Sequence, residues 1–279
     1  MQTRREFLGT LGLGALGAAT LACARQAASD QPGRMPIGIQ LYTLRSLLER
    51  DFDGTLARVA EIGYREVEFA GYYNRTPAQV REVLRRVGLA APSVHIPLPA
   101  TDDDWMRALD AAKIIGHEWA VVPWLDPTQR NDFGRLADRL NHLAVMTKNA
   151  GLRQAYHNHD FELAAAPGGG TYLDLLLART DPQLVSFEMD VYWVTKAGAD
   201  PLALMAKYPG RFPLLHIKDA TAAPERGIAD VGSGTIDWRA VFKAARAQGL
   251  QHAFVEHDHP ADPLASARAS FTYLSSLNV

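Results

Sequence analysis

From residue 35 onward, short apolar runs alternate eight times with segments of helical periodicity. Predicted strands cover residues 37–42, 66–69, 90–96, 119–124, the histidine-rich run from 156, 184–190, 212–219 and 253–257. Predicted helices cover 52–62, 77–87, 102–115, 131–150, 172–178, 201–208, 238–248 and 263–277. Eight strands that are each followed by a helix are typical of a (β/α)₈ TIM barrel, so we expect one α/β domain of that fold.

A doubly wound open sheet is the other arrangement that alternating strands and helices can form. A dinucleotide-binding sheet of that kind carries a G-x-G-x-x-G turn after its first strand. The turn after residue 42 has no such motif, and no internal repeat or low-complexity tract appears after Arg34. The barrel is therefore favoured.

Residues 1–24 predict an export signal rather than part of the fold. The run from Thr3 to Leu8 (TRREFL) resembles a twin-arginine motif, and an apolar, glycine-rich run then extends to Ala22. This run is too short and too weakly apolar for a stable membrane span. The chain's single cysteine, Cys23, lies in a sequence that resembles a lipoprotein cleavage box, although Ala22 to Ala24 also fits an A-x-A cleavage site.

These features predict a domain organisation and a location. Residues 25–34 are small and polar, as in a linker, and the barrel is expected over residues 35–279. We expect export to the periplasm by the twin-arginine route, with a lipid anchor at Cys23 as an open alternative. The net charge of −2 gives no electrostatic reason to expect a nucleic-acid partner, and one cysteine excludes an internal disulfide.

Polar side chains gather at the C-terminal ends of the predicted strands, whose bodies are otherwise mostly apolar. They are Glu68, His95, His157, His159, Asp190, His216, Lys218 and Glu256. In a barrel, these strand ends meet on the face where the chemistry takes place. Four of them come from the fifth to eighth strands, namely His157, Asp190, His216 and Glu256. Because imidazole and carboxylate groups bind divalent cations, these four predict one metal site.

Several of these segments together resemble the xylose isomerase-like TIM barrels, that is, the sugar phosphate isomerase/epimerase superfamily and its inosose dehydratase-like branch. The segments that carry the resemblance are 37–42 (IGIQLY), 67–69 (VEF), 156–159 (YHNH), 189–193 (MDVYW), 216–219 (HIKD) and 255–256 (VE). They are distributed over nearly the whole chain that follows the leader and linker. The resemblance implies a metal-dependent enzyme that acts on a small carbohydrate.

The resemblance also implies a ligand set for one divalent metal ion, Mn, Co, Mg or Zn. In the family, Glu, Asp, His and Glu from the fifth to eighth strands hold the ion, and Asp190, His216 and Glu256 match the last three. His157 stands where sugar epimerases commonly have Glu, and His159 is the alternative ligand at this strand. Trp193 replaces a family histidine and is expected to form a wall of the substrate pocket.

By this resemblance, the ion polarises a carbonyl and a side chain moves the neighbouring proton. Glu256 is the expected base, with His159 and Lys218 as candidates for the second acid or base. Substrate hydroxyls are expected to contact Tyr42, Glu68, His95 and Glu162. Lys218 has a rival role, which is to pair with Asp219 or another carboxylate at the rim.

The function expected first is a metal-dependent isomerase or epimerase of a sugar or polyol derivative that acts through an enediolate. The alternative is a metal-dependent dehydratase or lyase on a keto-sugar or keto-inositol, which the histidine at position 157 favours. A nuclease like endonuclease IV is disfavoured by the charge balance, and a sugar-binding protein without activity is a third class. The family often forms homo-oligomers, so the resemblance leaves that assembly open.

Overall fold

The computed structural model describes residues 36–277. The expected twin-arginine signal, Cys23 and the linker over 25–34 lie outside these residues, so those expectations stay predictions. In the described part of the chain, no helix has the length and apolar character that crossing a bilayer requires.

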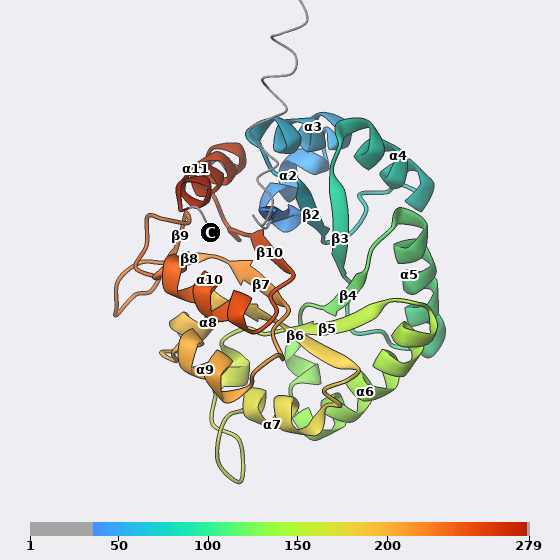
Figure 1. Ribbon diagram of the computed structural model, residues 1–279. Helices are drawn as coiled ribbons and strands as arrows, with labels where there is room; N and C mark the ends of the chain where they lie inside the picture. The colour runs from blue at the N-terminus through green and yellow to red at the C-terminus, as the bar shows by residue number, and fades with distance from the viewer. Residues whose placement is uncertain (1–35, 278–279) are drawn as a thin grey trace, which may run out of the picture. The chain divides into compact units, whose positions relative to one another are not determined.

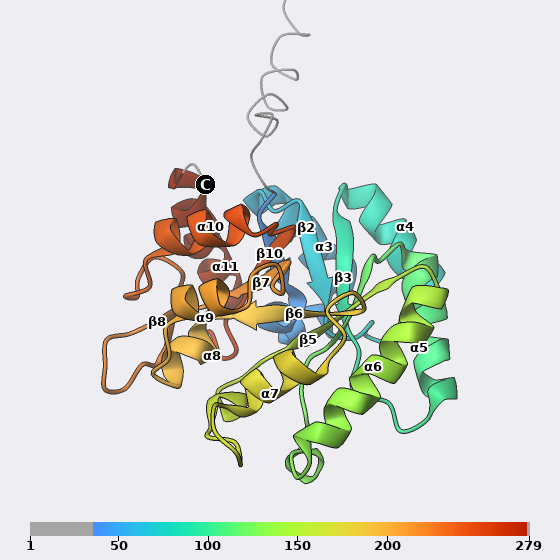
Figure 2. The same cartoon turned by 60° about the horizontal axis from the view of Figure 1, so that its bottom comes forward.

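Eight parallel strands close into a barrel, and helices surround it (Figures 1 and 2), which confirms the predicted (β/α)₈ fold. The strand order around the barrel is β1-β10-β7-β6-β5-β4-β3-β2. The barrel strands are β1 Gly38–Gln40, β2 Glu66–Phe69, β3 Ala90–His95, β4 Trp119–Val122, β5 Arg153–His157, β6 Val185–Asp190, β7 Leu214–Ile217 and β10 His252–Val255. A separate antiparallel pair, β8 Asp219–Ala220 and β9 Ile228–Ala229, follows β7.

The α-helices are α2 Arg45–Leu48, α3 Phe52–Ile62, α4 Pro77–Val87, α5 Asp102–Ile115, α6 Phe133–Asn149, α7 Tyr172–Arg179, α8 Val191–Lys196, α9 Pro201–Lys207, α10 Trp238–Ala247 and α11 Pro263–Ser276. Three short 3₁₀ helices, η1 Leu41–Leu44, η2 Pro127–Gln129 and η3 Phe161–Leu163, interrupt the loops. Local sequence sets the helix ends. Thr76 and Thr101 form capping boxes at the starts of α4 and α5, and left-handed glycines, Gly88 and Gly116, end the same two helices.

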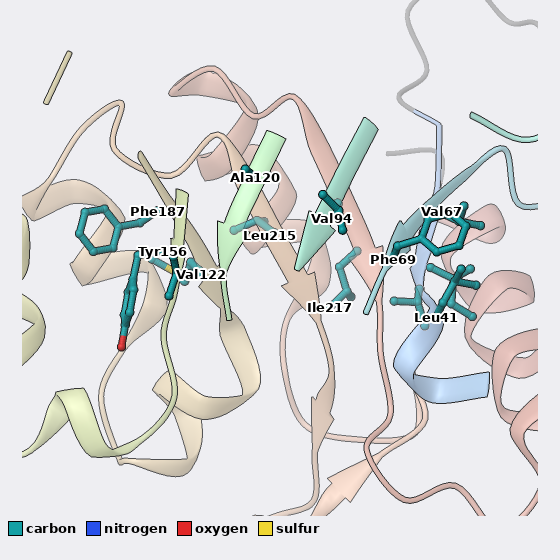
Figure 3. Packing of buried hydrophobic residues seen from close by; sticks show 14 of the residues in the cluster. Leu41, Val67, Phe69, Val94, Ala120, Val122, Tyr156, Phe187, Leu215 and Ile217 are labelled. Atoms are coloured by element: carbon teal, nitrogen blue, oxygen red, sulfur yellow. The ribbon is translucent and has the colours of Figure 1, made fainter. Parts of the chain in front are cut away.

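The main hydrophobic core lies between the strands and the surrounding helices. Figure 3 shows part of it, where side chains such as Val67, Val94 and Ile217 lie close to the strands that carry them. A second buried cluster, the apolar plug, consists of Trp119, Val121, Ala155 and Leu214. Side chains two residues apart on a strand share a face. His157 and His216 therefore lie on the same face as Ala155 and Leu214, one layer nearer the C-terminal end of the barrel.

Three of the differences from the prediction bear on the site, and in two of them a side chain caps the backbone. The first strand ends at Gln40, whose side chain accepts a hydrogen bond from Tyr42 N at 3.0 Å and starts η1. The sixth strand leads directly into α8, an unpredicted helix, because Asp190 Oδ1 accepts from Trp193 N at 2.9 Å. The fifth strand ends at His157, so His159 lies in the following turn rather than on the strand.

Candidate active site

The structure brings seven of the predicted polar residues to one end of the barrel. Glu68 lies in β2, His95, His157 and Asp190 end β3, β5 and β6, His216 lies in β7, and Lys218 and Glu256 directly follow β7 and β10. The parallel register places Asp190 beside His216 across β6 and β7. All seven are buried or nearly so, which makes their charges strongly coupled.

Two buried carboxylates, Glu68 and Glu188, lie beneath the histidines, and we call them the carboxylate floor. Glu188 Oε2 is 2.9 Å from His95 Nε2, 3.1 Å from His157 Nδ1 and 3.1 Å from His216 Nε2. His216 Nε2 also lies 2.6 Å from Glu68 Oε2. Because an ionised carboxylate only accepts hydrogen bonds, each of these ring nitrogens carries its hydrogen toward the floor.

Further hydrogen bonds and charges hold the floor ionised. Glu68 accepts from Gln40 Nε2 at 2.8 Å and from Ser93 Oγ at 2.5 Å. Burial acts to raise the pKa of Glu68, but the attraction of two imidazoles lowers it well below its usual value. Burial and the charge of Glu68 act to raise the pKa of Glu188, yet the histidines bring it down to about 2. The floor therefore stays negative at neutral pH.

The floor determines which ring nitrogens remain free on the upper side of the histidines. With hydrogens on Nδ1 of His157 and Nε2 of His216, the lone pairs of a neutral ring lie on His157 Nε2 and His216 Nδ1. His157 Nε2 is 3.6 Å from Asp190 Oδ2, and His216 Nδ1 is 2.7 Å from Glu256 Oε2. A lone pair that faces a carboxylate oxygen this closely requires positive charge between the two atoms.

The donor atoms on this upper side fit a divalent metal ion. Ligand atoms of Asp190, His216 and Glu256 lie within 4.8 Å of one another. His157 belongs to a second such group, with His95, Glu188 and His216, and its Nε2 also lies 3.6 Å from Asp190 Oδ2. Asp190 Oδ2 is buried and makes no hydrogen bond of good geometry, and its charged neighbour is Lys218 Nζ at 3.0 Å. Two imidazoles and two carboxylates form a donor set of the kind that Zn²⁺ or Mn²⁺ takes.

Negative charge exceeds positive charge in this part of the barrel. The carboxylates in contact with the site are Glu68, Glu188, Asp190, Glu256 and Asp258. Burial acts to lower the pKa of His216, but Glu188, Glu256 and Glu68 raise it well above its usual value. The raised pKa means that the surrounding carboxylates favour a positive charge at His216. A bound cation would supply that charge in place of the proton.

Lys218 is the ammonium group of the site. Its Nζ lies 3.0 Å from Asp190 Oδ2, 2.8 Å from Glu256 Oε2 and 2.9 Å from Asp258 Oδ1. Burial acts to lower the pKa of Lys218, but these three carboxylates raise it well above its usual value, so it stays protonated. Lys218 thus pairs with other carboxylates at this end of the barrel, as its rival role predicted, and not with the neighbouring Asp219. Asp219 instead accepts hydrogen bonds from backbone nitrogens of the 219–238 loop.

A cavity of about 670 Å³ opens above these groups. His157, Lys218 and Glu256 line its inner part, and His159 lines the wall beside them. Burial, followed by the charge of Lys218, lowers the pKa of His159 well below its usual value, so the ring is neutral. Its Nδ1 is buried without a hydrogen-bond partner. The cavity thus combines imidazole and carboxylate groups that could hold a cation, a protonated lysine and a neutral imidazole.

The chain matches the model of the xylose isomerase-like TIM barrel family over residues 56–277. It belongs to that family. Among solved structures, a sugar phosphate isomerase/epimerase from Parabacteroides distasonis ATCC 8503 is 28% identical, with a TM-score of 0.77, and the match covers 88% of this chain and 96% of that one. The IOLI protein with a bound zinc atom has a TM-score of 0.68 at 14% identity and covers 87% of this chain, a likeness of fold alone.

The curated relatives include inosose dehydratases. Inosose dehydratase 2 of a Bacillus cereus strain is 32% identical over 196 residues, which is 61% of this chain and 64% of that protein. The inosose dehydratase of Lacticaseibacillus casei is 24% identical over 242 residues, 72% of this chain and 80% of that protein. The chain spans less than two thirds of the length of most of the inosose dehydratases that it matches.

Within this xylose isomerase-like barrel, two residues expected to contact substrate hydroxyls lie away from the cavity. Glu68 is fully buried in the carboxylate floor, with its oxygens occupied by side chains. Glu162 is also fully buried and accepts from Tyr156 Oη and from His159 N at 2.8 Å, so it positions the turn that carries His159. Tyr42, His95 and Trp193 do line the cavity.

Sequence reasoning missed three residues of this barrel end: Glu188, Asn158 and Asp258. Glu188 precedes Asp190 by two positions, so strand alternation places both on one face, and this signal was available in the sequence. Asn158 accepts a hydrogen bond from Asp190 N at 3.2 Å through its side chain. Asp258 follows its strand by three positions in a loop, where no periodicity indicates a direction.

Proposed function

We propose that this chain is a divalent-metal-dependent enzyme that removes the proton beside the carbonyl of a keto-sugar or keto-cyclitol and then eliminates water. The observation that carries the proposal is the pair of imidazole nitrogens, on His157 and His216, that face the carboxylates of Asp190 and Glu256. These four residues would hold the metal ion. When bound, the ion would withdraw charge from a substrate carbonyl and make the adjacent C–H bond more acidic.

His159 is the base in this proposal. It is neutral and it lines the cavity, so the ring nitrogen that carries no hydrogen has a lone pair that can take up a proton. Glu256, the base expected from sequence, is less suited. Lys218 Nζ and His216 Nδ1 both contact its Oε2, and the proposed metal ion would draw on the same carboxylate.

Lys218 is the acid that protonates the departing hydroxyl. It stays charged because three carboxylates surround it, and it lines the same cavity as His159. A two-glutamate epimerase returns the proton from a second carboxylate on the opposite face of the substrate. Here His157 stands at the corresponding position of the fifth strand, and an ammonium acid supports elimination instead. The inosose dehydratases among the relatives agree with this reaction type.

Isomerisation or epimerisation of a sugar derivative is the second candidate. It begins with the same proton removal, and the similarity to the Parabacteroides distasonis sugar phosphate isomerase/epimerase favours it. The two reactions differ in the fate of the intermediate, which loses a hydroxyl in a dehydratase and regains a proton in an isomerase.

The test measures metal content and then proton chemistry. We expect purified full-length protein to contain about one divalent ion per chain by elemental analysis, and Asp190→Asn to lose it. With inosose and a panel of keto-sugars in D₂O, NMR should show loss of water from one substrate, and EDTA should abolish the reaction. Deuterium incorporation without loss of water would support the isomerase.

Two variants make the test specific. His159→Gln should keep its metal and lose proton exchange, whereas Asp138→Asn, a carboxylate that pairs with Arg179 at the surface, should retain both. Exchange that survives EDTA, or protein without metal that remains active, would contradict the proposal.

A further inference from the structure

Aromatic side chains form the outer part of the cavity. Tyr42, Trp124, Phe161 and Trp193 line it, and we call them the aromatic rim. Trp124 is 48% exposed, and Tyr42 is 39% exposed. Large apolar side chains exposed together around a cavity commonly mark a binding surface. The metal and proton chemistry proposed above uses none of the four.

Neighbouring side chains hold Trp124 in one orientation. The Arg130 guanidinium carbon lies 4.3 Å from the Trp124 ring centre and 3.7 Å from that of Phe161. Arg130 is itself fixed, since its Nε and Nη2 donate to Leu125 O at 3.0 and 2.8 Å. Phe161 meets Trp124 edge to face at 5.7 Å. A ring held this way loses little conformational freedom when a ligand packs on it.

The rim adjoins the reacting centre. The ring centres of Trp124 and His159 are 4.7 Å apart and the rings are nearly perpendicular, and the ring centre of Trp193 lies 5.4 Å from that of His159. A ligand ring stacked on Trp124 would therefore adjoin the ring that reacts at His159. The cavity volume of about 670 Å³ falls within the range of about 300–1,000 Å³ that encloses a ligand of several fused or linked rings.

Lys218 and Arg130, two cationic side chains that line the cavity, are already engaged by other groups. Lys218 is already surrounded by three carboxylates, and Arg130 uses two nitrogens on Leu125 O and its flat face on Phe161. Asp160 and Asp258 also line the cavity and would repel a phosphate. An uncharged ring avoids this repulsion.

We propose that the aromatic rim is an outer subsite for a second, uncharged pyranose ring linked to the sugar that reacts, stacked on Trp124. One face of a pyranose presents C–H bonds with partial positive charge, which match the negative face of an indole ring. This inference rests on the proposed function, because the reacting ring must lie at His159 and Lys218. It names the substrate class as a glycoside with at least two rings rather than a sugar phosphate.

Isothermal titration calorimetry on the metal-loaded full-length protein tests the subsite. The probes are glucose, glucose 6-phosphate and a panel of glucosyl disaccharides with different linkages. We expect at least one disaccharide to bind about ten-fold more tightly than glucose, and glucose 6-phosphate to bind no better than glucose. Trp124→Ala should remove the disaccharide's advantage and leave the glucose affinity unchanged.

Matched variants separate stacking from folding. Trp124→Phe keeps an aromatic face and should retain most of the advantage, and Ile114→Ala, at an exposed apolar residue on α5, should change nothing. Equal binding of glucose and every disaccharide, tighter binding of glucose 6-phosphate, or an equal loss for both sugars in Trp124→Ala would overturn the inference. Metal content and proton exchange are measured separately, so failure here leaves the proposed function standing.

Discussion

At the scale of single residues, Glu188 links the histidines of the site through one oxygen atom. It does not line the cavity, but its Oε2 accepts hydrogen bonds from His95 and His157 and lies 3.1 Å from His216 Nε2. A carboxylate behind a metal-binding imidazole fixes the tautomer and orientation of the ring and makes it a better ligand. Glu188 is therefore a positioning residue in the proposed metal site.

Replacing that carboxylate by an amide of the same shape tests this role. Glu188→Gln should weaken metal binding by about 10- to 100-fold, because one of its amide hydrogens would then face an imidazole hydrogen. Competition with a metal-sensitive dye measures the change. Glu66→Gln is the matched control and should bind metal normally. Glu66 lies in β2 of the same barrel, and its Oε2 is 2.8 Å from His252 Nδ1. Equal affinities of Glu188→Gln and the unmodified protein would contradict the assignment.

Residue types and strand periodicity predicted most of the polar residues at this barrel end, since two-residue alternation assigns a face. They could not distinguish the residues of the carboxylate floor from the residues that face the cavity. Glu68 and Glu256 look alike in sequence, yet Glu68 is held below by Gln40 and Ser93, and Glu256 faces the cavity. That difference depends on the stagger between neighbouring strands, which one sequence does not express.

At the scale of elements, His117 joins β3 to the loop after β2. Its ring hydrogen-bonds Ala91 O at 2.6 Å, lies 3.2 Å from Tyr72 Oη, and is nearly fully buried. Burial lowers the pKa of His117 to about 4, so the folded protein holds the ring neutral. An unfolded chain protonates this histidine below about pH 6.5.

This difference makes stability depend on pH in one direction. Above pH 6.5, both states hold a neutral ring and the stabilisation is complete. As pH falls from about 6.5 to about 4, the unfolded state gains a proton that the folded state does not, and on the order of 3 kcal/mol is lost. We expect urea midpoints measured between pH 7 and pH 5 to fall less in His117→Gln than in the unmodified protein. Equal falls in the urea midpoints of the two proteins would show that the titration of other groups dominates the pH dependence of stability.

Helix and strand positions followed from sequence because periodicity and capping residues are local. Thr76, Thr101, Gly88 and Gly116 each lie where a helix begins or ends. Element ends that depend on a side chain folding back were missed. The helix α8 begins only because Asp190 turns its Oδ1 toward the backbone, while its other oxygen faces the proposed metal site.

At the scale of the whole molecule, the location in the cell remains a prediction from residues 1–24. If the twin-arginine signal operates, replacing Arg4 and Arg5 together by lysine should keep the protein in the cytoplasm. Fractionation of cells that express the two forms, followed by immunoblotting, measures the distribution. Removal of residues 1–34 should give the same cytoplasmic location with normal thermal unfolding. Equal periplasmic amounts of the unmodified protein and the double-lysine variant would refute export by the twin-arginine route.

The apolar plug of Trp119, Val121, Ala155 and Leu214 closes the barrel just below the carboxylate floor. Because that end of the barrel is closed, no molecule can pass through its centre. Substrate and product must therefore use the same opening, the cavity mouth beside His159 and Trp124. A product that stayed bound there would block the next substrate, so the rate of product release would limit turnover directly.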